Sequence, residues 1–174
     1  MPPVIGLAAF SGSGKTTLAR HLIELLVQRG FRVGVIKHAH HDFDIDQPGK
    51  DSYELRKAGA EQTLISSRRR RALITEIGTR SEPALPALIS ELDSSLDLIV
   101  VEGFKHSDIP KLEIRRIEAG TPALAPTDPN VIAIVTNAPP DPSVSSGLPV
   151  LDLDAPECVV EFIVARFLTS TGSA

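Results

Sequence analysis

The sequence predicts an α/β fold, a mostly parallel sheet with helices on both faces and a hairpin insertion. Three observations predict it. Short apolar runs alternate with amphipathic segments along the whole chain of 174 residues. Most of these runs are apolar throughout rather than at every second residue, which is typical of strands buried on both faces. A glycine-rich stretch, residues 9–16, follows the first run directly and opens a helical segment.

The elements follow one another in β-α-β order. Valine- and isoleucine-rich runs predict strands, and leucines at helical spacing predict helices. Strands are expected at residues 4–10, 31–37, 61–67, 71–77, 96–104, 111–117, 130–137 and 150–154, and helices at 15–29, 52–59, 84–93 and 158–168. The strands at 61–67 and 71–77 are sequence neighbours and predict the hairpin. Residues 120–129 and 138–149 are expected as loops, residues 1–168 as one domain, and residues 169–174 as a disordered tail.

The composition excludes several classes of protein. Hydrophobic residues make up 42% and charged residues 23%, which is a globular rather than a disordered composition. The net charge of -4 argues against a nucleic-acid-binding polycation. A single cysteine, Cys158, cannot form an internal disulfide. The chain begins without a basic leader and has no apolar run of about 20 residues, the length of a membrane span. We therefore expect a cytoplasmic protein that binds neither nucleic acid nor membrane.

Residues 9–16, AFSGSGKT, fit the phosphate-loop (Walker A) pattern except that alanine stands first. Gly12 and Gly14 allow the backbone N–H groups to converge on a phosphate, and the following helix directs its N-terminal dipole at the same anion. Lys15 is expected to reach the outer phosphates, and the hydroxyl of Thr16 to coordinate Mg²⁺. The alternative is a glycine- and serine-rich turn in front of an ordinary helix.

Glu102 ends the apolar run LDLIVVEG and is the candidate second acidic residue of such a site. Ligands of open α/β sheets gather beyond the carboxyl ends of the strands. Glu102 is therefore expected to hold Mg²⁺ through a water molecule or to orient an attacking water. The alternative is a plain surface carboxylate at the end of a strand.

Histidine or aspartate occupies every second position in residues 38–46, HAHHDFDID. In an extended chain His38, His40, Asp42, Asp44 and Asp46 project to one side. The aspartates suit Mg²⁺, and Asp42 is the candidate metal ligand, whereas the histidines favour Zn²⁺ or Ni²⁺. Three interpretations stay open here, namely a loop that faces nucleotide and Mg²⁺, a structural polar loop, and a transition-metal site.

Two basic clusters complete the candidates. Residues 68–71 are four arginines, explained either by the turn of the predicted hairpin or by the docking of an anionic partner. Lys105, His106 and Lys111 follow Glu102 closely, which makes a role near the metal plausible.

The segments SGSGKTT, IKHAHHDFDIDQPGKDSYELRKAGA and LDLIVVEGFKHSDIPKLEI together resemble the molybdopterin-guanine dinucleotide biosynthesis protein B (MobB) family, over most of residues 4–117. The resemblance implies a homodimeric, weakly hydrolytic GTP-binding protein of phosphate-loop fold, which assists the guanylyltransferase that attaches GMP to molybdopterin. It also implies that Thr16 holds Mg²⁺ and that Glu102 is the second acidic residue. The residues implied to hold the phosphates are Ser11, Gly12, Ser13, Gly14, Lys15, Thr16 and Thr17.

Guanine preference follows from the resemblance alone, because VTNAPPD contains Asn137 but no Asn-Lys-x-Asp pattern. Three other functions stay open. The first is a GTP-dependent metallochaperone that delivers a divalent metal through His38, His40 and His41. The second is a kinase with a small acceptor, and the third is a binding module in which nucleotide is only a conformational signal.

Overall fold

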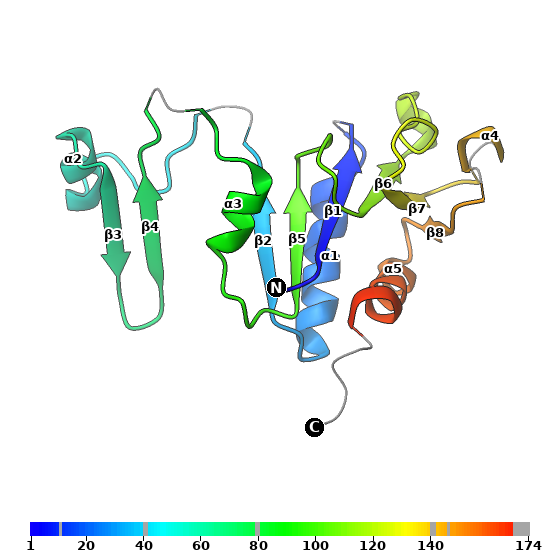
Figure 1. The fold of residues 1–174 in the computed structure, drawn as a ribbon, viewed down its shortest axis with the longest axis horizontal. Helices are drawn as coiled ribbons and strands as arrows, with labels where there is room; N and C mark the ends of the chain where they lie inside the picture. Colours follow the sequence, from blue (N-terminus) through cyan, green and yellow to red (C-terminus); the bar gives the residue numbers. More distant parts are fainter. Residues whose placement is uncertain (11, 40–41, 79–80, 140–141, 146, 169–174) are drawn as a thin grey trace. The chain divides into compact units, whose positions relative to one another are not determined.

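The computed structural model describes residues 1–10, 12–39, 42–78, 81–139, 142–145 and 147–168 (Figure 1). Contacts along the chain divide it into two compact units, residues 1–38 with 85–174, and residues 39–84. We call them the sheet unit and the hairpin unit and describe each by itself. The single domain expected over residues 1–168 stays a prediction, and the tail expected at 169–174 lies outside the described residues.

The sheet unit contains a six-stranded sheet in the order β2-β5-β1-β6-β7-β8, in which every neighbouring pair is parallel. β1 lies between β5 and β6, with Leu7 opposite Glu102 on one side and Ala9 opposite Ile114 on the other. The loop after β1 therefore leaves the sheet between the ends of β5 and β6. The strands are β1 (Val4–Ala9), β2 (Val33–Lys37), β5 (Leu98–Glu102), β6 (Lys111–Arg115), β7 (Val131–Thr136) and β8 (Val150–Asp152).

Helices cover both faces of this sheet (Figure 1). On one face, α1 (Lys15–Gln28) and α5 (Pro156–Ile163), which continues as a π-helical turn η2 (Val164–Leu168), pack on β1 through residues such as Leu22 and Ile163. On the other face, Leu85 and Ile89 of α3 (Leu85–Ser90) pack on β2 and β5. The predicted fold class is confirmed. One difference is a helical turn in each segment beyond β6 and β7, η1 (Ile117–Ala119) and α4 (Pro142–Ser145).

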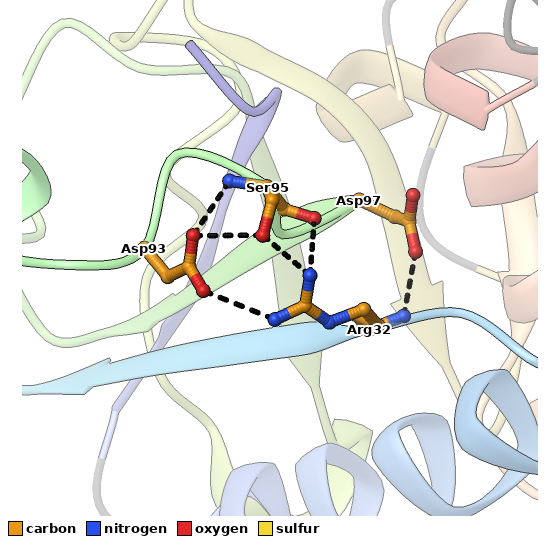
Figure 2. A network of polar contacts seen from close by, with 4 residues as sticks. All are labelled: Arg32, Asp93, Ser95 and Asp97. Atoms are coloured by element: carbon orange, nitrogen blue, oxygen red, sulfur yellow. Dashed lines mark hydrogen bonds and ion pairs between the residues drawn. The ribbon is translucent and has the colours of Figure 1, made fainter.

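Arg32, just before β2, ties the amino end of that strand to the segment that leads into β5 (Figure 2). Its guanidinium donates to Asp93 at 3.0 Å and to the carbonyl of Ser95 at 3.1 Å, and its backbone N–H donates to Asp97 at 2.7 Å. The N–H of Ser95, its hydroxyl and the Arg32 guanidinium together lower the pKa of Asp93 to about 2. This network joins the amino-terminal ends of β2 and β5, which lie at the opposite end of the strands from the glycine loop.

The hairpin unit contains the antiparallel pair β3 (Gln62–Ser66) and β4 (Arg71–Thr75), preceded by α2 (Asp51–Lys57). The turn is closed by a hydrogen bond from the N–H of Ser67 to the carbonyl of Arg70 at 2.8 Å. The predicted hairpin is therefore confirmed, and residues 68–70 of the arginine run form its turn. In the part of the chain that the structure describes, no helix is long and apolar enough to cross a bilayer.

Candidate functional site

The loop between β1 and α1 has the backbone of an anion cradle. Gly12 and Gly14 have φ values of 80° and 83°, in the left-handed region that side chains rarely adopt. Gly14 is the N-cap of α1, and no side chain caps the helix there. The first N–H groups of α1, from Lys15 onward, therefore have no partner within the helix and attract an anion.

Ser13 adds a second sign that this loop is shaped for a ligand. The residue is 3% exposed, and its Oγ has no hydrogen-bond partner among the described residues. A buried hydroxyl without a partner is unfavourable, since it has lost its hydrogen bonds to water. A phosphate oxygen in the loop would supply an acceptor, so the loop fits a phosphorylated ligand. Ser11, another predicted phosphate ligand, lies outside the described residues.

The carboxylate of Glu102 lies beside the start of α1. Its Oε1 accepts a hydrogen bond from Oγ1 of Thr16 at 3.4 Å and is 3.8 Å from Nζ of Lys15. The side chain of Glu102 is only 14% exposed, so this carboxylate is not the plain surface group of the alternative interpretation. A hydroxyl and a carboxylate are oxygen ligands of the kind that Mg²⁺ prefers. The structure thus brings three predicted residues together, and their role as ligands stays a prediction.

The backbone around Glu102 is held by its neighbours in the sheet unit. The N–H of His38 donates to the carbonyl of Glu102 at 2.8 Å, and the His38 ring packs on Phe104 with centroids 4.8 Å apart. Gly103 has a φ of 100°, and a Cβ there would overlap the side chain of His38. The turn after β5, which directly follows Glu102, therefore requires glycine.

Two cationic side chains lie near the glycine loop, one of which the sequence predicted and one of which it did not. Nζ of Lys105 lies 3.5 Å from the ring centroid of Phe10, the first residue after β1. Lys105 was a sequence-based candidate because it follows Glu102 closely. Arg116 lies beside Gly14, since a Cβ on Gly14 would be 3.3 Å from Nε of Arg116. Arg116 is not among the sequence-based candidates. Its signal in the sequence is the arginine pair 115–116, which lies near the end of the expected strand 111–117.

Lys111 lies away from the loop, although it follows Glu102 closely in sequence. It is 1% exposed, and its Nζ donates to the carbonyl of Ser107 at 2.6 Å and pairs with Asp128 at 2.7 Å. Burial alone raises the pKa of Asp128, but hydrogen bonds from Lys111 and from the N–H of Asn130 outweigh it, and the net direction is downward. Lys111 therefore has a structural role, and the expectation of a role near the metal finds no support in its position.

The aspartates of residues 38–46 belong to the hairpin unit. Arg56 of α2, whose side chain is 7% exposed, pairs with Asp44 at 2.5 Å, with Asp46 at 2.8 Å and with Glu76 at 2.9 Å. These contacts favour the structural interpretation for Asp44 and Asp46. The carboxylates also raise the pKa of Arg56 further above its usual range, Asp46 most of all.

Asp42 lines a hollow of about 690 Å³ within the hairpin unit, together with Lys57 and Glu82. Its role as a metal ligand stays a prediction. Among the described residues, no group of three or more His, Cys, Asp or Glu side chains is arranged to hold a metal ion. His40 and His41, on which the metallochaperone alternative depends, lie outside the described residues.

A parallel sheet whose central strand leads through a glycine loop into a helix, with an acid at the end of the next strand, defines an α/β protein of the phosphate-loop NTPase class. The chain belongs to the MobB family, described as molybdopterin guanine dinucleotide synthesis protein B, whose profile matches residues 4–137. The resemblance inferred from the sequence is confirmed.

Two relatives and one solved structure support this assignment. The chain is 48% identical to the molybdopterin-guanine dinucleotide biosynthesis adapter protein of Escherichia coli (strain K12) over 166 residues, 94% of this chain and 93% of that protein. It is 43% identical to the protein of the same name in Haemophilus influenzae, over 79% of this chain and 76% of that one. The crystal structure of Bacillus subtilis MobB superposes with a TM-score of 0.72 at 26% identity, covering 96% and 99% of the two chains.

Proposed function

We propose that this chain is a GTP-binding adapter protein of molybdopterin guanine dinucleotide synthesis. It binds GTP with Mg²⁺, hydrolyses it slowly, and assists a guanylyltransferase that attaches GMP to molybdopterin, as a cytoplasmic homodimer. The names of the Escherichia coli and Haemophilus influenzae relatives support the pathway. The observation that carries the nucleotide site is the juxtaposition of Lys15 and Thr16 with Glu102 at the end of the glycine loop.

Each residue of the loop has a separate task in this proposal. The N–H groups of residues 12–17 and the hydroxyl of Ser13 bind phosphate oxygens, and Lys15 neutralises the outer phosphates. Thr16 and Glu102 hold Mg²⁺, which supplies positive charge to the terminal phosphates. Glu102 also orients the water that attacks the terminal phosphate.

Guanine recognition in this proposal rests on the family rather than on Asn137. The side chain of Asn137 is used within the chain, because its Nδ2 donates to both carboxylate oxygens of Glu118, at 2.9 and 3.0 Å. Its Oδ1 accepts from the N–H of Ile117 at 3.3 Å. Asn137 therefore holds η1 against the end of β7, so a base-reading role would require this arrangement to open.

Calorimetric titration with GTP and Mg²⁺ tests the site. Lys15→Ala is expected to weaken binding about 100-fold, because a charge-assisted contact contributes about 2–3 kcal/mol. Arg20→Ala is the matched control, since Arg20 is an exposed cation of the same helix that pairs with Glu24 at 3.9 Å. Unchanged GTP affinity in Lys15→Ala would overturn the site assignment.

The partner is tested by a pull-down with purified molybdopterin guanylyltransferase, with and without GTP and Mg²⁺. Binding that depends on nucleotide is expected for the wild type and is reduced in Lys15→Ala. No association under either condition would contradict the adapter role while leaving the nucleotide site intact.

A further inference from the structure

Arg116 and Glu102 lie on opposite sides of the glycine loop. Glu102 ends β5 and Arg116 directly follows β6, and these two strands are the neighbours of β1 on its two sides. The guanidinium of Arg116 lies against Gly14, because a Cβ there would be 3.3 Å from its Nε and 3.5 Å from its Nη2. The loop thus has an acid and a hydroxyl on one side and a planar cation on the other.

The guanidinium is weakly engaged by the protein. Its one ion pair among the described residues joins Nη2 to Oδ1 of Asp154 at 4.0 Å, and both side chains are solvent-accessible, at 40% and 69%. A pair at that distance between exposed groups contributes little to stability. The Arg116 side chain makes no hydrogen bond to a described residue, and its charge contributes to lowering the pKa of Glu118. Its donors and its flat face are therefore available to a ligand in the loop.

The positions of Thr16 and Glu102, the proposed Mg²⁺ ligands, indicate how a bound nucleotide is oriented in the loop. Thr16 and Glu102 would hold the Mg²⁺ that accompanies the outer phosphates of a nucleoside triphosphate, so these phosphates would lie on the side of Thr16 and Glu102. The nucleoside is at the other end of the phosphate chain and is thereby displaced away from β5. Within the sheet, the direction away from β5 leads across the loop toward β6, where Arg116 lies.

We propose that Arg116 contacts the nucleoside of the bound nucleotide, with its guanidinium stacked on the purine ring. A guanidinium is planar, permanently charged and weakly hydrated, so it stacks on aromatic rings better than the ammonium group of lysine. Asp154, exposed and 4.0 Å away, does not compete strongly for the guanidinium. This inference rests on the proposed nucleotide site and assigns its nucleoside end.

The test compares the affinity for GTP with the affinity for inorganic tripolyphosphate, which has no nucleoside, both with Mg²⁺. Arg116→Ala is expected to raise the dissociation constant of GTP about tenfold and to leave that of tripolyphosphate unchanged. Arg116→Lys, which keeps the charge but loses the planar group, is expected to resemble Arg116→Ala. The control is Arg166→Ala, which removes an exposed arginine from η2 and is expected to change neither constant.

Other outcomes overturn the inference in recognisable ways. If Arg116→Ala weakens both ligands equally, the side chain contacts phosphate rather than nucleoside. If neither constant changes, Arg116 does not touch the nucleotide. Lys15→Ala measured in parallel separates this inference from the nucleotide site itself, because loss of both ligands in Lys15→Ala establishes the site independently of Arg116. A wild-type protein that binds neither ligand would overturn both proposals.

Discussion

Oγ1 of Thr16 donates a hydrogen bond to Oε1 of Glu102 across 3.4 Å, although 86 positions separate the two residues in the sequence. The contact joins the first turn of α1 to the end of β5, and the proposed Mg²⁺ site depends on it. A hydroxyl and a carboxylate this close, with Lys15 3.8 Å from the same oxygen, form a compact polar cluster at the mouth of the glycine loop. Its members can be tested separately.

Glu102→Gln is expected to reduce GTP hydrolysis about 100-fold or more, because the amide cannot orient water or accept a proton as the carboxylate does. Phosphate release under saturating GTP and Mg²⁺ measures it. Stimulation of the guanylyltransferase by the same variant then distinguishes two roles of the nucleotide. Retained stimulation indicates that bound GTP alone is the signal, and lost stimulation indicates that turnover is required. Hydrolysis at the wild-type rate would remove Glu102 from the site.

Gly103→Ala is expected to lower the free energy of unfolding by about 1–3 kcal/mol through backbone strain, and further through overlap with His38. Gly30→Ala is the matched control, because Gly30 also has a positive φ, 89°, but a Cβ there meets nothing within 4 Å. Urea unfolding of both variants measures the difference. Equal losses would show that the overlap with His38 relaxes without cost.

Lys111→Ala is expected to lower the free energy of unfolding by about 3 kcal/mol, since it leaves Asp128 without its buried partner. Lys111→Met keeps the apolar stem, which lies close to Gly6, and so isolates the loss of the charge. Adding Asp128→Asn to Lys111→Met should recover part of the loss in chemical denaturation. If Lys111→Met is as stable as the wild type, the ion pair contributes nothing to stability.

Asp93→Asn is expected to change the pH dependence of stability. The hydrogen bonds from Ser95 and Arg32 lower the pKa of Asp93 from its ordinary 3.8 to about 2 in the folded protein. A lowered folded-state pKa stabilises the fold above the ordinary pKa, and this contribution is lost as pH falls from about 4 to about 2. The difference in unfolding free energy between wild type and variant should therefore be largest above about pH 5 and should disappear by about pH 2.

The matched control for this pH series is Glu91→Gln. It removes a carboxylate just after α3 that accepts no hydrogen bond from the residues that the structure describes. A difference between wild type and Asp93→Asn that stays constant from pH 7 to pH 2 would contradict the role assigned to Asp93.

Arg56→Lys is expected to loosen the hairpin unit, because an ammonium cannot reach Asp44, Asp46 and Glu76 together as the guanidinium does. Hydrogen exchange of the amides in β3 and β4 should become faster, whereas the amides of β1 and β5 should keep their protection. Lys57→Ala serves as the control, as it removes the neighbouring exposed cation of the same helix. Unchanged exchange in Arg56→Lys would show that these ion pairs do not stabilise the unit.

Much of the architecture follows from local patterns. The apolar runs that became β1, β5 and β7 are recognisable because a strand buried on both faces has no polar positions. The glycine loop is recognisable because two positive φ values and an uncapped helix start demand a particular local sequence. The helix α4 was less predictable, since it is a single helical turn that begins at Pro142 in a sequence with the composition of a loop.

The sequence by itself determined the alternation of strands and helices, the glycine loop and the acid at the end of β5, because each depends on neighbouring residues in the chain. Only the tertiary structure decided that Lys111 is buried against Asp128, that Arg56 engages the aspartates of its own unit, and that Arg116 lies beside Gly14. The physical reason is strand order: parallel pairing joins segments distant in sequence, and buried parallel strands look alike in composition. Pairing β1 with both β5 and β6 placed Glu102 and Arg116 on opposite sides of one loop.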